Sequence, residues 1–198
     1  MKVYSIVLLV SVAVLVSCAT VTPIANDLST PPQRSVHRGF SLLPLDETGW
    51  QIGASDRDRL VLGKRGDNPD ETFAIIGFTV VLPEFESRDQ FIGFAKNVTP
   101  ETDPVRFKQL SEQAKETTIN EQPCIQIKSL MEDHAANKWG TNRPDFMIIE
   151  TYEIVCPHPQ KTVAIVVGYS HRYYPGNADS QSEEKAGRIF ETVEFINF

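Results

Sequence analysis

The sequence predicts an α+β domain, an antiparallel β-sheet flanked by helices in the manner of an α/β/α sandwich. Segments with strand character come before and after stretches with helical spacing, and the turns between the later strands are short enough for antiparallel hairpins. A helical stretch closes the chain. The composition fits a folded protein, because 41% of the 198 residues are hydrophobic and 23% are charged.

Residues 72–82 form the longest of three strands predicted in the first half of the chain. Apolar side chains occupy both alternating faces of this segment, with Phe73 on one face and Phe78 on the other. A strand that is apolar on both faces is typical of the middle of a sheet covered on each side. The other two predicted strands are residues 49–52 and 59–64.

Two helices are predicted in the middle of the chain. Ser87 and Gln90 have the spacing of a capping box, which satisfies free backbone amides at a helix start. Asp103 and Pro104 match the N-cap and first residue of a second helix. The apolar residues with helical spacing are Phe91, Phe94, Ala95 and Val98 in the first helix and Phe107, Leu110 and Ala114 in the second.

Three strands and a helix are predicted for the remainder. The strands are expected at residues 122–132, 146–156 and 161–172, and residues 157–160 connect the last two. Residues 180–183 have the pattern of a cap for the closing helix. Its apolar stripe consists of Ala186, Ile189, Phe190, Val193 and Ile196.

This order of elements resembles the Mog1/PsbP-like family over about residues 38–198. The resemblance implies an antiparallel sheet between helical layers. It implies no particular activity and no site residue, because a fold does not specify the site it carries. The features that carry it are the Gly49-Trp50 opening, the strand ending at Leu82-Pro83, the capped helix after Ser87, the strands from Cys124 to Arg172, and the final helix with Phe190 and the following Phe195.

The N-terminus resembles the signal peptide of bacterial lipoproteins. Lys2 precedes a nearly unbroken apolar run over residues 3–16, which is too short to span a membrane but fits the core of a signal peptide. The run ends in Leu15-Val16-Ser17-Cys18, which resembles a lipobox. The resemblance implies removal of residues 1–17 and attachment of a diacylglyceryl group and an acyl chain at Cys18. The alternative is an uncleaved N-terminal anchor with an incidental cysteine.

Residues 18–37 are predicted to be a flexible tether, because they are rich in Thr, Pro, Ser and Asn, and residues 38–198 a single globular domain. Ala19 stands where the inner-membrane retention signal of such lipoproteins has Asp, so the resemblance implies the outer membrane. Removal of Lys2 with the signal changes the net charge from −7 to −8. An acidic surface disfavours nucleic acid as a partner.

Cys124 and Cys156 are predicted to form a disulfide. They are symmetric about Gly140, so antiparallel pairing of the two strands places them opposite each other. The same register makes Lys128 a diagonal neighbour of Glu150, which allows an ion pair. A compartment outside the cytoplasm permits disulfides. The alternative is two buried, unreactive thiols.

Tyr169, His171 and Tyr173 form a candidate ligand-binding patch. They alternate along a predicted strand and therefore share one face. Aromatic groups with polar tips suit sugars, peptides or small ligands. The alternative is that the rings pack beneath the final helix.

The sequence contains no recognisable catalytic motif. Residues 168–172 begin like a nucleophile elbow, but Arg172 stands where the motif needs glycine. Glu132, Asp133 and His134 could be metal ligands, but consecutive strand residues point to opposite faces, so a solvated strand end is the better interpretation. We therefore predict no catalytic residue, no metal and no cofactor.

These features predict a non-enzymatic binding or accessory lipoprotein on the periplasmic face of the outer membrane. Its expected partners are the membrane, through the lipid, and an envelope protein or a small ligand, whereas its oligomeric state is left open. One alternative is an envelope hydrolase acting on cell-wall or lipid material, which would gather His134, His171 and carboxylates in a pocket. Another is a small-ligand carrier, which would enclose an apolar cavity.

Overall fold

The main element of the fold is a large antiparallel sheet. The computed structural model describes residues 26–68, 70–98, 103–135 and 145–198. Eight strands form the sheet, and each hydrogen-bonded pair of neighbours is antiparallel. Their order is β1 (Asn26–Asp27), β4 (Gln51–Ser55), β5 (Arg59–Arg65), β6 (Thr72–Val81), β10 (Val163–Tyr173), β9 (Met147–Pro157), β8 (Gln122–Asp133) and β7 (Phe107–Ile119).

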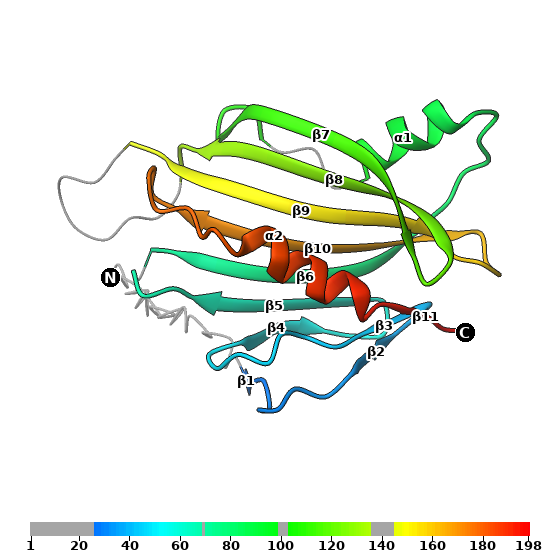
Figure 1. The fold of residues 1–198 in the computed structure, drawn as a ribbon, viewed down its shortest axis with the longest axis horizontal. Coiled ribbons are helices and arrows are strands. Elements are labelled where there is room, and N and C mark those ends of the chain that lie inside the picture. Colours follow the sequence, from blue (N-terminus) through cyan, green and yellow to red (C-terminus); the bar gives the residue numbers. More distant parts are fainter. Residues whose placement is uncertain (1–25, 69, 99–102, 136–144) are drawn as a thin grey trace, which may run out of the picture.

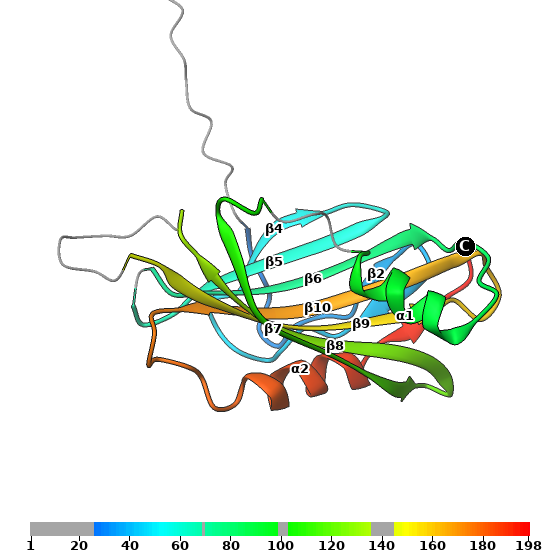
Figure 2. The same ribbon diagram turned by 90° about the horizontal axis from the view of Figure 1, so that it is seen from above.

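A small sheet and two helices pack on this large sheet. The small sheet has the order β11 (Glu194–Phe195), β3 (Phe40–Leu42) and β2 (Ser35–His37). The helices are α1 (Arg88–Lys96) and α2 (Ser182–Glu191). Figure 1 shows α2 lying across the large sheet over β10, and Figure 2 shows it along one side of that sheet.

Each face of the large sheet has its own apolar cluster and its own helix. In β10, Ile165 and Val167 pack with α2 and the small sheet, whereas Ala164 and Val166 pack with α1. Over the described residues the fold is thus mostly antiparallel sheet with two helices, one on each face. Because each helix is a single short element, the sheet is more dominant than the sequence predicted.

The central strands agree with the sequence analysis. β6 is the fourth strand of the large sheet, and its two faces contribute to the two different clusters, through Phe73 and Phe78 respectively. Helix α1 begins after Ser87, whose hydroxyl accepts a hydrogen bond from the amide of Gln90. The side chain of Gln90 in turn accepts from the amide of Glu86. A cap of this kind satisfies amides that the helix itself leaves free.

The second predicted helix is wrong, because residues 107–119 form β7. Asn120 and Glu121 both have positive φ, at 46° and 67°, and make a two-residue turn that folds β7 back along β8. Such turns match the twist of a hairpin. Pairing with β8 over nearly the whole strand outweighs the helical spacing of Phe107, Leu110 and Ala114.

The boundary predicted between tether and domain also differs. Residues 26–37 were assigned to the tether, but they contain β1 and β2, and His37 is buried beside Phe40 with ring centroids 5.1 Å apart. Ordered structure therefore begins by Asn26. The signal peptide and Cys18 lie outside the described residues. In the part of the chain that the structure covers, no helix has the length and apolar character needed to cross a bilayer.

Candidate binding site

Tyr169, His171 and Tyr173 share one face of β10, as predicted, but they are buried in the interior, where Tyr169 packs in the same cluster as residues of α2. Their exposed fractions are 1%, 0% and 6%. The ring of His171 stacks on Phe73 at 4.3 Å and lies 4.6 Å from the ring of Tyr173. The structure therefore favours interior packing of these rings over an open ligand-binding patch.

The two histidines that a hydrolase site would need have separate partners. His171 Nε2 lies 2.6 Å from Glu71 Oε1 in the interior. His134 is exposed and its Nε2 lies 2.9 Å from Glu132 Oε2 at the end of β8. The structure does not bring these two histidines together in one pocket.

Glu132 and Asp133 point to different environments, as the alternation of a strand requires. Asp133 is fully buried and receives two hydrogen bonds from Arg106, at 2.8 and 2.9 Å. Burial alone would raise the pKa of Asp133, but the hydrogen bonds and positive charge of Arg106 hold this pKa below its ordinary value. Glu132 instead pairs with Lys108 at 3.3 Å. Asp133 thus has a structural partner of its own.

The predicted disulfide is present between Cys124 on β8 and Cys156 on β9. The predicted register is confirmed, since Ile125 lies opposite Val155. Lys128 Nζ also lies 3.2 Å from Glu150 Oε1, which confirms the diagonal ion pair. The disulfide closes a loop with a sequence separation of 32 and joins β8 to β9 beside the β7–β8 turn.

Within the part of the chain that the structure describes, an apolar concavity lies between α1 and the end of the β7–β8 hairpin. We call it the α1 groove. Its volume is about 470 Å³, and it is open to solvent along one side. Such a groove is large enough for a few apolar side chains. Its lining residues are Arg88 and Phe91 from α1, Glu116, Thr117 and Thr118 from β7, Pro123, Cys124 and Ile125 from β8, and Pro157 from β9.

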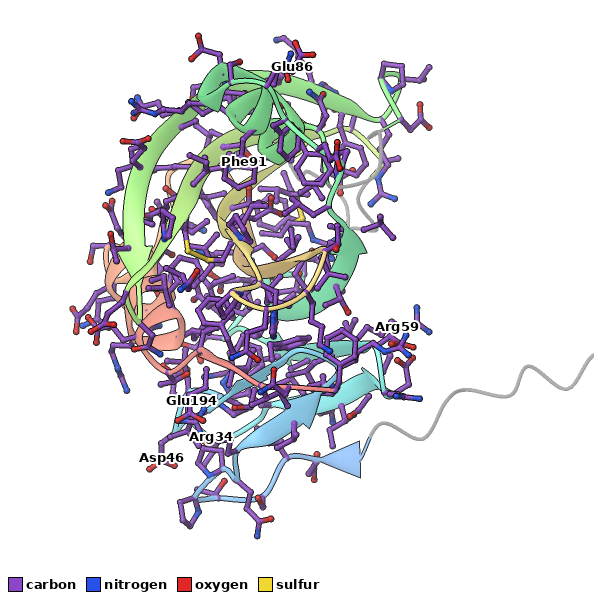
Figure 3. The ribbon with its side chains drawn as sticks, turned by 90° about the vertical axis from the view of Figure 1, so that its right-hand side faces the viewer. Arg34, Asp46, Arg59, Glu86, Phe91 and Glu194 are labelled. Atoms are coloured by element: carbon purple, nitrogen blue, oxygen red, sulfur yellow. A yellow bond between two sulfur atoms is a disulfide. The ribbon has the colours of Figure 1, made fainter. Side chains whose placement is uncertain are left out.

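Helix α1 supplies the apolar wall of the α1 groove. Phe91 packs against the cluster that contains Ile125, and its ring lies 5.5 Å from that of Phe85 and 6.4 Å from that of Phe94. Figure 3 looks along the sheet from this end of the molecule, with α1 above the strands. Arg88 and Glu116 form an ion pair at the mouth. The groove therefore combines an apolar base with a charged rim.

One carboxyl group lies on the α1 side of the large sheet with no ionic partner. Glu153 on β9 is partly buried, and no hydrogen bond or ion pair reaches it from the described residues. Burial, with a smaller contribution from the charge of Glu112, raises the pKa of Glu153 to about 7. Glu112 is paired with Lys96 of α1 at 3.0 Å. The charge of Glu112 therefore adds to the effect of burial in disfavouring ionisation of Glu153.

Sequence reasoning did not find the α1 groove. It placed residues 107–114 on a helix, which removed one wall of the groove, and it treated Pro157 only as part of a connection between strands. The residues that signal a strand were present, since Thr117, Thr118 and Ile119 are β-branched in succession.

Comparison with known proteins adds little to this geometry. No protein-family model matches the chain, and no curated protein matches it. Among solved structures, it is similar to the cyanobacterial PsbP (CyanoP) of Synechocystis sp. PCC 6803, determined in solution. The match covers 92% of this chain and 99% of that one, with 14% sequence identity and a TM-score of 0.40. A likeness this distant assigns no function.

Proposed function

We propose that this chain is a non-enzymatic binding or accessory protein of the bacterial cell envelope, attached to the outer membrane through lipid on Cys18. The observation that carries the binding role is the α1 groove, an open apolar concavity of about 470 Å³. Exposed apolar concavities with a polar rim are typical of surfaces that receive a partner.

The place of the α1 groove in the sheet is consistent with an anchored protein. The groove lies at the β7–β8 side, and β1, the described strand nearest to Cys18 in sequence, is at the opposite edge. The two edge strands are separated by seven inter-strand spacings, which together amount to roughly 30 Å. The segment from Cys18 to Asn26 can extend over at most roughly 28 Å. The chain toward Cys18 would therefore leave the domain at the β1 edge, on the other side of the sheet from the groove.

The groove favours a partner over an enclosed ligand. A carrier for a small apolar molecule surrounds most of its ligand, whereas the α1 groove is open along one side. Its charged residues, Arg88 and Glu116, form an ion pair at the rim.

We also propose that the domain is a Mog1/PsbP-like α/β/α sandwich reduced to one helix on each face. The support is the order of elements over about residues 38–198 and the position of α1 and α2 on opposite faces. An experimental structure in which one face carries no helix would contradict this assignment.

Two experiments test the function. Palmitate labelling and membrane fractionation of the Cys18→Ser variant test the anchor. We expect loss of label and release from membranes, and unchanged processing would refute the anchor.

For the binding role, a photo-crosslinking amino acid is placed at Thr118 in the groove and, as a control, at exposed Ser55 on β4. We expect a discrete protein adduct from position 118 alone. Equal adducts from both positions, or none from either, would reject the binding role.

A further inference from the structure

Strand β7 presents a long free edge. It is the last strand of the large sheet, and within the described residues only β8 pairs with it. Most side chains along its 13 residues are exposed. The opposite edge is different, because β1 has two residues. A long exposed edge offers unpaired backbone groups to an added strand.

The hairpin geometry shows which backbone groups are free. In a two-residue hairpin the residues flanking the turn, here Ile119 and Gln122, form a hydrogen-bonded pair, and this state alternates along the strand. The amides and carbonyls of every second residue therefore point away from β8. These outward residues are Glu112, Ala114, Glu116 and Thr118, and we call residues 112–118 the open edge.

The first half of β7 is protected against the addition of another strand. A register shift between Gln109 and Ser111 bulges the strand at Leu110. Bulges disturb the regular spacing that an added strand needs. Residues 112–118 contain no proline and pair with β8 without interruption. The open edge is therefore the part of β7 that fits another strand.

The charges of the open edge select the kind of partner. Glu112 and Glu116 lie on the same face of β7, with Ala114 between them. Lys96 and Arg88 reach them from α1, but the side chains of Glu112 and Glu116 remain 32% and 52% exposed. The whole chain is acidic, with a net charge of −7. A strand with basic side chains opposite the two glutamates would be complementary.

A second copy of this chain fits the open edge poorly. When the open edges of two copies pair antiparallel with their side chains on matching faces, the pairing is symmetric about one residue. That residue lies opposite the same residue of the other copy. Centring on Glu112, Lys115 or Glu116 places a charge opposite itself, and centring on Ala114 places Glu112 opposite Glu116. Centring on Gln113 leaves Glu112 diagonal to both glutamates of the other copy, and centring on Thr117 leaves Glu116 diagonal to its own counterpart. Centring on Thr118 places Glu116 opposite Asn120, which belongs to the turn and not to the strand. Like charges at such positions destabilise the pairing.

We infer that the open edge of β7 accepts an extended basic segment of another protein as an added antiparallel strand. The α1 groove shares Glu116, Thr117 and Thr118 with this edge, so an apolar side chain of the added segment can enter the groove. Main-chain pairing would provide affinity and the groove specificity, as in other cases of strand addition. The basic segment would be the partner in the proposed binding role, and this inference rests on that proposed function.

The test uses the full chain and two short fluorescent peptides, one of alternating lysine and valine and one of alternating glutamate and valine. We expect the lysine peptide to bind, as measured by fluorescence anisotropy, and the glutamate peptide to bind at least about 10-fold more weakly. The Ala114→Pro variant should lose the lysine peptide, because proline removes an outward amide that the fold itself does not use. Equal binding of both peptides, or full binding by Ala114→Pro, would overturn the inference.

A second variant guards against misfolding of Ala114→Pro. The double variant Glu112→Gln with Glu116→Gln keeps the strand and removes its charges, so we expect about 10-fold weaker binding of the lysine peptide. Unchanged binding would contradict the charge argument. The photo-crosslinked adduct from position 118 distinguishes failure of the proposed strand addition from failure of the proposed binding role. If the adduct forms while the peptides fail, only strand addition is wrong; if it does not form, the binding role fails as well.

Discussion

Glu153 on β9 lies directly opposite Gly168 on β10, and its side chain occupies the space that a larger residue there would fill. A Cβ atom added to Gly168 would lie 3.2 Å from Glu153 Cγ and 3.0 Å from Ile76 Cγ1. The glycine thus allows a carboxyl group to lie close to the sheet among apolar neighbours. This burial is the main cause of the raised pKa of Glu153.

Replacement of Glu153 by Gln should stabilise the protein at alkaline pH. The folded-state pKa of Glu153, about 7, lies above its ordinary value of 4.5, so the folded chain binds this proton more tightly than the unfolded chain. The contribution of Glu153 to stability is therefore fully present below about pH 4.5 and is lost as the pH rises through 7. We expect Glu153→Gln to raise the free energy of unfolding at pH 8 by roughly 1–3 kcal/mol. Urea titrations at several pH values measure this.

The control for this prediction is Glu191→Gln, an exposed residue at the end of α2. We expect it to change stability by less than about 0.5 kcal/mol at either pH. A parallel pH dependence in the wild type and Glu153→Gln would show that Glu153 ionises normally.

His171→Ala should destabilise the fold. The ring is fully buried, bonded to Glu71 and stacked on Phe73, so its loss leaves a cavity and an unpaired carboxylate. We expect a loss of roughly 2–4 kcal/mol in chemical denaturation. His134→Ala, at an exposed histidine, should cost less than about 0.5 kcal/mol. Equal stability of the two variants would argue that His171 is accessible and open to a ligand after all.

Reduction of the Cys124–Cys156 disulfide should lower the free energy of unfolding by roughly 3–4 kcal/mol. This is the entropy expected for opening a loop with a sequence separation of 32. Denaturation with and without a reductant measures the loss. The same reductant should leave the double variant Cys124→Ala with Cys156→Ala unaffected, and a reductant effect in that variant would point to another cause.

Gly77→Ala should disturb the contact between the two sheets. A Cβ at Gly77 on β6 would lie 2.7 Å from Cε2 of Phe40 on β3, whose ring is fully buried. We expect a loss of roughly 1–3 kcal/mol from this overpacking. Gly93→Ala on α1 is the matched control, because no atom lies within 4 Å of its added Cβ. That change should stabilise by up to about 1 kcal/mol. Equal effects at both positions would mean that Phe40 moves freely.

Local patterns in the sequence determined the middle of the fold. The alternation in residues 72–82 identified a central strand, and the symmetry of Cys124 and Cys156 fixed the register of β8 and β9 and the Lys128–Glu150 pair. These features depend on residues that are near neighbours in the chain or across one hairpin. The same local reasoning placed the cap at Ser87, because its hydrogen bonds reach only three residues away.

Other features depended on contacts that the sequence does not encode locally. Residues 107–114 have apolar spacing that fits a helix, and pairing with β8 decided in favour of a strand. Tyr169, His171 and Tyr173 were correctly placed on one face. The sequence could not show whether that face is open or buried, because burial depends on tertiary packing. The α1 groove brings together residues from α1 and three strands, so it could appear only once those elements were packed.

The sequence by itself determined the strand character of the central sheet, the disulfide pairing and the acidic charge, since these follow from alternation, symmetry and composition. Only the tertiary structure decided that β7 is an edge strand, that the aromatic face of β10 is buried, and that a groove opens beside α1. The physical reason is that burial and edge exposure depend on which elements pack together across long separations in the chain.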